Sequence, residues 1–313
     1  MKKKNLLSLL FVFALLFSLS MPASAIDSNN VIQLDPVNEY DYIDMLQNSS
    51  PQELEEIGLS EFEAMEIVSN FENALLNRAS LSDSTLAAYG YNDSEIALFH
   101  RLAAGESLSS VELQSLGSTC TGSITRHSCY LKSAEFSYTF TWNRCPIATN
   151  SDAAALRWIA YDSSDSEIGV SQKSSSLTVE YHFTGNAGSD GSPAFAHYGT
   201  PTYEAQSDFN TINMQFPVAQ THLVSGTGMI LDCYAKTGTV RVSVKVPNGV
   251  TGNIHHIFVG GLYGHSVLGV VSPSISVSKG SIGISFTGGV TVDHIADRKA
   301  TIYYSSETVE YWN

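Results

Sequence analysis

The stretch TVRVSVKV, residues 239–246, decides the fold because valine occupies every second position. Successive side chains of a strand point to opposite faces, so this stretch predicts a strand with one apolar and one polar face. The same period of two recurs in FSYTFTW, residues 136–142, and in SLTVEYHF, residues 176–183. One buried face per strand is typical of antiparallel sheets.

Turn signals separate the predicted strands. They are Thr237-Gly238, Pro247-Asn248-Gly249, Lys279-Gly280 and Gly288-Gly289. Short strands divided by such turns, with no long helical pattern between them, predict a β-sandwich. We therefore expect residues 119–313 to form an all-β antiparallel sandwich, whose strand order the sequence leaves open.

Residues 26–118 have a different composition. They contain 17 acidic and 2 basic residues, a net charge of −15, whereas residues 119–313 contain 14 acidic and 11 basic residues, a net charge of −3. The motif L-x-x-apolar-G occurs in this acidic region at residues 54–58, 86–90 and 113–117. A glycine in this position is typical of a helix C-terminus, where it adopts the left-handed conformation.

New helix starts follow the first two copies of this motif. Ser60 precedes Glu63 by three residues, and Asn92 precedes Glu95 by three, which is the spacing of a capping box. The fold class is therefore α+β by segment: a small N-terminal helical region with helix-turn-helix-like repeats, followed by the all-β antiparallel sandwich. The acidic charge excludes a DNA-binding role for the repeats and nucleic acid as a partner.

Residues 1–25 predict a secretory signal peptide. They combine a basic start at Lys2–Lys4, an apolar run at Leu6–Leu19 and small residues at Ala23–Ala25. The apolar run is shorter than the roughly 20 residues of a membrane-spanning helix. We therefore expect a secreted, extracellular bacterial protein that begins at residue 26.

Four cysteines follow this segment, namely Cys120, Cys129, Cys145 and Cys233. An even number of cysteines in a secreted chain predicts two disulfides, and four cysteines allow three pairings. One pairing joins Cys120 to Cys129 in a short loop and Cys145 to Cys233 in a long one. The spacings contain no C-x-x-C pair, so a structural zinc site is disfavoured.

The stretch GGLYGHSVLGV, residues 260–270, nearly matches the G-x-S-x-G motif of the α/β-hydrolases around Ser266. Position 268 is leucine instead of glycine, and the residues that follow predict a strand where the motif requires a helix. We therefore assign no catalytic residue. The glycines of this stretch indicate tight turns or close packing between strands.

Histidines and acidic residues provide two weak metal candidates. His255 and His265 form the first, since a hairpin would bring them together, whereas the adjacent His255 and His256 point to opposite faces of a strand. The second is a calcium site in one acidic turn, formed by Asp162, Asp165 and Glu167. The acidic turn lacks EF-hand spacing, so its alternative is a solvated turn. The alternative for the histidines is one buried, hydrogen-bonded side chain and one exposed side chain. Calcium is the one cofactor considered; otherwise we expect none.

Residues 272–295 alternate between apolar and small polar residues, as strands of a membrane β-barrel do. Hairpins of this Ser/Thr-rich kind resemble the insertion hairpins of secreted β-pore-forming toxins. The resemblance implies a soluble protein that unfolds a hairpin and oligomerises in a membrane. The apolar residues that it assigns to the membrane hairpin are Ile282, Ile284, Phe286, Val290 and Val292.

These patterns favour a non-catalytic extracellular binding or structural module whose partner is an unknown protein or carbohydrate. Tyrosines are the candidate contact residues, namely Tyr198, Tyr203, Tyr234 and Tyr263. The alternative is a membrane-perturbing, β-pore-forming protein that uses hairpin 272–295, and a secreted hydrolase is third. The sequence leaves open the partner, the oligomeric state and whether residues 26–118 are a removable pro-segment.

Overall fold

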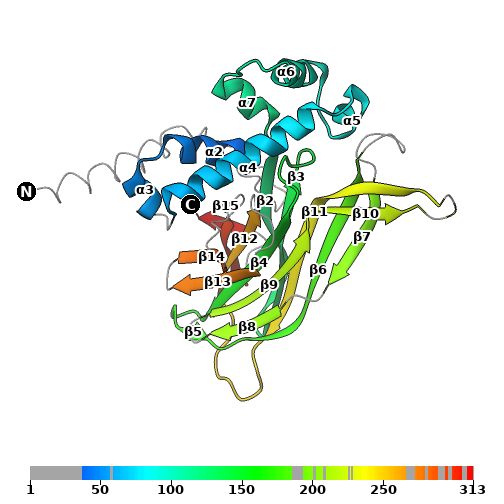
Figure 1. The fold of residues 1–313 in the computed structure, drawn as a ribbon. Coiled ribbons are helices and arrows are strands. Elements are labelled where there is room, and N and C mark those ends of the chain that lie inside the picture. Colours follow the sequence, from blue (N-terminus) through cyan, green and yellow to red (C-terminus); the bar gives the residue numbers. More distant parts are fainter. Residues whose placement is uncertain are drawn as a thin grey trace, which may run out of the picture.

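The computed structural model contains a helical layer, two large antiparallel sheets and a small two-stranded one, with the helices gathered over one end of the large sheets (Figure 1). The alternating pattern therefore predicted the fold class correctly: a helical N-terminal region followed by an antiparallel β-sandwich. The structure describes residues 37–56, 59–184, 193–199, 202–206, 209–224, 226, 228–265, 272–278, 281–287, 293–294, 298–304 and 309–312.

The helices of the described chain are α2 (Glu39–Asn48), α3 (Pro51–Glu56), α4 (Glu61–Ala79), α5 (Asp83–Ala88), α6 (Asp93–Ala103) and α7 (Ser110–Leu116). Ser60 and Asn92 cap α4 and α6 in the two predicted capping boxes. Gly90 has a φ of +98°, the left-handed conformation predicted for it. Gly117 does not: its φ is −62°, and it is close to Asn38, where a β-carbon would overlap the side chain.

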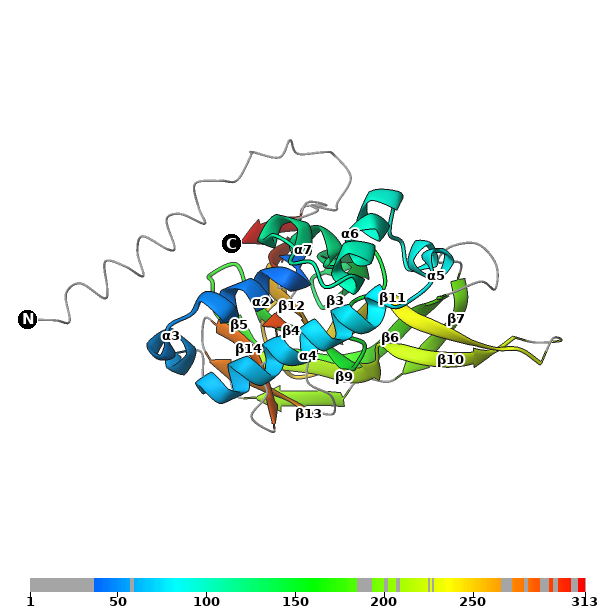
Figure 2. The ribbon, with the colours of Figure 1, turned by 45° about the horizontal axis from the view of Figure 1, so that its top comes forward.

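A hydrophobic core of their own holds the helices together. Ile43 of α2, Ile67 and Phe71 of α4 and Phe99 of α6 are all buried in it. Helices α2 and α4 run side by side, as Figure 2 shows. Among the described residues, no helix is both long and apolar enough to cross a membrane.

The first sheet contains β1 (Val37–Asn38), β2 (Thr119–Tyr130), β3 (Ser133–Trp142), β6 (Ser171–Phe183), β7 (Pro193–Gly199), β10 (Ala219–Leu223) and β11 (Ile230–Lys245). Its strand order is β1-β2-β3-β11-β6-β7, and β10 also pairs with β11. The short β1 comes directly before α2 and pairs with β2, so it joins the helical region to the edge of this sheet.

The second sheet contains β4 (Ser151–Tyr161), β5 (Glu167–Ile168), β8 (Thr202–Gln206), β9 (Phe209–Pro217), β12 (His256–His265), β15 (Asp293–His294), β16 (Arg298–Tyr303) and β17 (Val309–Trp312). Its order is β17-β16-β12-β4-β9-β8, with β15 on β12 and β5 on β4. Strands β13 (Ser272–Ser278) and β14 (Ser281–Thr287) form a separate two-stranded sheet.

Aromatic and aliphatic side chains fill the space between the two large sheets. Phe136 of β3 meets Trp158 of β4 edge to face, with ring centroids 5.9 Å apart. Val240, Val242 and Val244 of the opening stretch are fully buried in the same core. Each such side chain contributes about 1.5–3 kcal/mol through burial, so the apolar row of this strand stabilises the sandwich.

One predicted turn is wrong. Thr237-Gly238 lies inside β11, immediately after a bulge at Ala235/Thr237. Gly238 pairs with Phe140 of β3, and a β-carbon at Gly238 would overlap the Phe140 ring. This glycine therefore makes room for an aromatic core residue within the strand. The predicted turn at Pro247-Asn248-Gly249 does follow β11, with Gly249 at a φ of +89°.

The cysteine pairing also needs correction. All four cysteines are buried, and the structure shows no disulfide among them. Cys120 and Cys129 are on the same strand, β2, nine positions apart, which separates them by about 30 Å at roughly 3.3 Å per residue. A disulfide needs α-carbons within about 7 Å, so the short-loop pair is wrong. A Cys145–Cys233 disulfide stays a prediction.

Candidate ligand-binding cleft

A cleft of about 590 Å³ opens between the helical layer and the first sheet. The C-terminal part of α4 and the residues after α5 form one wall, and β10 and β11 form the other. The segment between β3 and β4, which includes Cys145 and Ile147, forms the floor. The cleft thus lies where the two parts of the chain meet.

Arg78 and Tyr89 build the helical wall. The Arg78 guanidinium lies 4.6 Å from the centroid of the Tyr89 ring. It also donates hydrogen bonds to the carbonyl oxygens of Cys145 (2.7 Å) and Pro146 (2.5 Å). Although burial opposes its charge, Tyr91 and other neighbours raise the pKa of Arg78 above its ordinary value. Arg78 is therefore a permanent cation that fixes both α4 and the Tyr89 ring over the floor.

Tyr89 follows the last turn of α5, whose cap it forms. A side-chain hydrogen bond joins it to Thr184, which follows β6. Burial raises the pKa of Tyr89, so it is a neutral phenol at physiological pH. Tyr234 of β11 lines the opposite wall, and burial likewise raises its pKa. Both phenols therefore line the cleft, Tyr89 partly exposed and Tyr234 with 3% of its surface exposed.

Polar side chains surround the mouth of the cleft. Asn77, Thr149, Thr221 and Asp232 are exposed there and supply an amide, two hydroxyls and a carboxylate. Gln220 lies deeper, and its amide nitrogen donates to the Tyr181 hydroxyl at 2.9 Å. Hydrogen-bonding groups and aromatic faces thus converge on one concave space, which is the composition expected of a small-ligand site.

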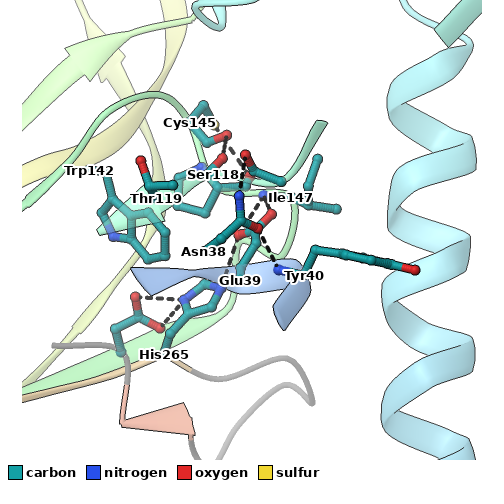
Figure 3. Close-up of polar contacts among 12 residues, drawn as sticks. Asn38, Glu39, Tyr40, Ser118, Thr119, Trp142, Cys145, Ile147 and His265 are labelled. Atoms are coloured by element: carbon teal, nitrogen blue, oxygen red, sulfur yellow. Dashed lines mark hydrogen bonds and ion pairs between the residues drawn. The ribbon is translucent and has the colours of Figure 1, made fainter. Parts of the chain in front are cut away.

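A cluster of buried charged groups lies next to the floor (Figure 3). Glu39, the first residue of α2, accepts hydrogen bonds from the backbone nitrogen of Ile147 at 2.8 and 3.1 Å. Its carboxylate oxygen Oε2 lies 3.8 Å from Nε2 of His265. Burial raises the pKa of Glu39 to about 7, although His265 and Arg78 oppose the shift.

His265, the last residue of β12, also contacts Asp152 of β4. Its Nδ1 lies 3.0 Å from both Asp152 carboxylate oxygens. Burial lowers the pKa of His265, but Asp152 and Glu39 outweigh it, so the net shift is upward. The Tyr263 hydroxyl donates to the same Asp152 carboxylate. These groups connect the start of α2 to strands β4 and β12 of the second sheet.

The buried cluster is closed to solvent, since the exposed fractions of Glu39, Asp152 and His265 are 1%, 0% and 0%. It has the residue types of an acid–base site, and its side chains are buried in this arrangement. Because Glu39 starts α2 while Asp152 and His265 are on β4 and β12, the cluster connects the helical layer to the sandwich.

The metal prediction that joined His255 to His265 is wrong. His255 immediately precedes β12 and His265 ends it, so the two are about 30 Å apart at roughly 3.3 Å per residue. His255 instead contacts His256, with their Nδ1 atoms 3.4 Å apart. In the described part of the chain, no three His, Cys, Asp or Glu side chains gather as metal ligands would.

The predicted calcium turn joins β4 to β5. One Asp162 oxygen accepts hydrogen bonds from Ser164 N, Ser164 Oγ and Ser166 N, at 2.8, 2.6 and 3.1 Å. Asp165 adopts a left-handed φ of 60° and is exposed, and Glu167 begins β5. These contacts make Asp162 the organiser of its own turn, which is the solvated-turn alternative.

The remaining predicted residues are scattered. Ser266, Val290, Val292 and residues 1–25 lie outside the described residues. Ile282, Ile284 and Phe286 are all on β14. Among the candidate contact tyrosines, Tyr234 lines the cleft. Tyr263 is buried in the core, so its predicted role in partner contact is wrong, while Tyr198 is exposed on β7 and Tyr203 lies on β8.

Sequence reasoning missed three residues that organise the junction, namely Glu39, Arg78 and Asp152. A signal existed for Arg78, which is one of only two bases in residues 26–118. A signal also existed for Asp152, the single charge in the apolar run before Arg157. Neither signal specifies a partner, because the contacts depend on how the sheets stack.

Comparisons with known proteins add little. No protein-family model and no curated protein matches the chain. Among solved structures, the chain is similar to AvmM, described as catalysing macrocyclization in alchivemycin A biosynthesis. The identity is 11%, the TM-score is 0.26, and the match covers 56% of this chain and 82% of that chain. A similarity of this size carries no argument about function.

Proposed function

We propose that this chain is a secreted, non-catalytic binding module whose ligand occupies the cleft between α4 and β10–β11. The observation that carries the proposal is the cleft itself, a concave space of about 590 Å³ flanked by Tyr89 and Tyr234. Pockets of this size with a few convergent polar groups are typical of small-ligand sites. The acid–base cluster beside it is sealed from solvent, which favours binding over catalysis.

The chemistry of the cleft favours a carbohydrate ligand. Phenol rings offer flat apolar faces with a polar tip, which suit the C–H faces of a sugar ring. Asn77 and Asp232 supply planar hydrogen-bonding groups at the mouth, and Thr149 and Thr221 supply hydroxyls. A neutral, hydroxyl-rich ligand uses all of these groups, whereas an anionic ligand meets the Asp232 carboxylate.

Calorimetric titration with a panel of soluble neutral and acidic oligosaccharides tests this proposal. We expect at least one neutral member to bind saturably, with no new reducing ends released. Tyr89→Ala weakens that binding at least tenfold. Tyr130→Ala is the matched control, because Tyr130 is 63% exposed on β2 and is outside the cleft. Turnover of a bound sugar, or equal losses in both variants, contradicts the proposal.

A membrane-active hairpin is the second candidate function. The observation that favours it is that β13 and β14 form a two-stranded sheet of their own, apart from the two large sheets. The pairing places Ile275 opposite Ile284 and Val277 opposite Ile282, so apolar positions pair with apolar positions along the ribbon. A ribbon that alternates in this way has the pattern of membrane β-hairpins.

Dye release from neutral and anionic liposomes tests the second candidate. If the hairpin acts on membranes, the protein releases dye and Ile284→Asp abolishes the release, whereas Ser285→Asp does not, since Ser285 is in the alternate row. Absence of release from either vesicle type contradicts this candidate and leaves the carbohydrate proposal standing.

A further inference from the structure

A second concavity, of about 460 Å³, lies on the helical layer away from the ligand cleft. The end of α2, the start of α3 and the first half of α4 form it. Its α4 residues are spaced as one helical face, namely Glu61, Ala64, Met65, Val68, Ser69 and Glu72. The span from Glu61 to Glu72 is about 16 Å at roughly 1.5 Å per residue, or three turns of a partner helix. We call this surface the α2–α4 groove.

The floor of the α2–α4 groove is apolar and partly uncovered. Leu46 and Leu54 are buried at its base, and Val68 is half-buried. Met65 lines the groove with 71% of its surface exposed, and the neighbouring Phe62 is 74% exposed. Large apolar side chains of this exposure, grouped beside a groove, mark an interaction surface. Methionine adapts its shape readily to a partner.

The rim of the groove is acidic. Glu61 and Glu72 line it, and Glu53, Glu55 and Glu66 are exposed on the adjoining helices. Within residues 26–118 only two bases could balance these charges. Arg78 is buried against Cys145 and Pro146, and Arg101 is engaged with Glu106 and Glu112. Arg144 of the sandwich pairs with Glu95 of α6, whereas no ion pair within the described part of the chain engages Glu61 or Glu72. Negative charge therefore surrounds the apolar floor of the groove.

We propose that the α2–α4 groove binds a cationic amphipathic helix of a partner protein. Apolar side chains of that helix, spaced i, i+3, i+4 and i+7, contact Met65, Val68 and Leu54. Lysines or arginines on its flanks face Glu61 and Glu72. This is the helix-in-groove mode of recognition, and the charge complementarity sets the orientation and speeds association. The groove is separate from the carbohydrate cleft, so this proposal is independent of that function.

Fluorescence anisotropy tests the proposal with a labelled model peptide of leucine and lysine, whose leucines occupy one helical face. We expect saturable binding that weakens as salt rises. Met65→Glu weakens it at least tenfold, since a charge replaces the apolar contact. Val111→Glu is the control: Val111 is 75% exposed on α7, outside the groove. Both variants add the same negative charge. If attraction by charge alone explained binding, both variants would bind the cationic peptide as tightly as the wild type or more tightly.

Equal affinity of the Met65→Glu and Val111→Glu variants overturns the proposal. So does equally tight binding of a peptide with the same composition but scrambled leucines. Sedimentation of the protein alone tests whether a second copy of the chain occupies the groove instead. Self-association that Met65→Glu abolishes would make the groove an interface between copies and would overturn the proposal. Thermal unfolding of both variants by circular dichroism shows that the exposed substitutions leave the helical layer folded.

Discussion

Glu39 Oε2 lies 3.8 Å from His265 Nε2, with both side chains buried, although one residue starts α2 and the other ends β12. His265 in turn contacts Asp152 of β4 at 3.0 Å. Three titratable groups from three elements thus meet without solvent. Because buried charges persist only with partners, their meeting fixes how the helical layer sits on the sandwich.

The first prediction concerns the pH dependence of stability. Burial raises the pKa of Glu39 to about 7 from an ordinary value of 4.5, so the folded state holds a proton that the unfolded state has lost between these values. The Glu39 contribution to the free energy of unfolding is therefore present below pH 4.5 and is lost as pH rises toward 7. At about 1.4 kcal/mol per pKa unit, the loss is on the order of 3 kcal/mol.

Glu39→Gln checks this prediction, because glutamine keeps the shape and does not titrate. Urea unfolding of both proteins from pH 4.5 to 8 gives the difference between their free energies of unfolding. We expect the wild type to lose stability relative to Glu39→Gln as pH rises. A difference that stays flat, or one of opposite slope, contradicts the upward shift of the Glu39 pKa.

The second prediction concerns the coupling of His265 and Asp152. His265→Leu leaves a buried carboxylate without its cation, and breaking a buried ion pair costs about 3–5 kcal/mol. Adding Asp152→Asn removes the unpaired charge and restores part of that loss. We therefore expect a double-mutant cycle, measured by denaturant unfolding, to give a coupling energy of about 0.5–3 kcal/mol. Additive losses would show that the two side chains act independently.

The third prediction concerns a close approach inside the sandwich. A β-carbon at Gly261 of β12 would overlap the ring of Tyr138 of β3. Overpacking of this kind destabilises by about 1–3 kcal/mol, so Gly261→Ala lowers the thermal unfolding midpoint. Gly169→Ala is the control, because its β-carbon meets nothing within 4 Å. Equal midpoints for the two variants would argue against this packing of the sheets.

The fourth prediction concerns Arg78 as the clamp of the cleft. Arg78→Met removes the Arg78 donor from the carbonyls of Cys145 and Pro146, and the Cys145 carbonyl keeps its hydrogen bond from Ser118. An unsatisfied buried group costs about 1–3 kcal/mol. We expect faster amide hydrogen exchange in the last turn of α4 and at Tyr89. Arg101→Met, in an exposed pair on α6, is the matched control and leaves that exchange unchanged. Unchanged exchange in both variants would show that Arg78 does not hold α4 and Tyr89 in place.

Local patterns predicted the elements and not the junction. The period of two identified β3, β6 and β11, and the capping boxes at Ser60 and Asn92 identified α4 and α6, because these signals depend on near neighbours in sequence. The same logic fits Ser109 and Glu112, which form a third capping box that was not predicted. The cleft joins residues from α4 to β11, so it depends on strand order, which periodicity does not encode.

The misplaced predictions have the same cause. Thr237-Gly238 has the composition of a turn, yet the ring of Phe140 on the next strand requires the glycine. His255 and His265 are close in sequence, yet one strand holds them apart. In each case the deciding contact comes from another strand or from the length of an element, and a single sequence shows neither.

If a carbohydrate binds in the cleft, a bulky side chain that fills the cleft abolishes that binding. Thr221 of β10 lines the cleft and is exposed, so Thr221→Trp blocks the entrance without disturbing the core. Leu223→Trp adds the same ring two residues along the strand, at a 59% exposed position outside the cleft. The measurement is a calorimetric titration of both variants with the tightest-binding oligosaccharide of the panel. We expect Thr221→Trp to weaken binding at least tenfold, whereas Leu223→Trp binds as the wild type does. Binding that survives in Thr221→Trp, or a panel in which no oligosaccharide binds the wild type, would show that the cleft is not a carbohydrate site.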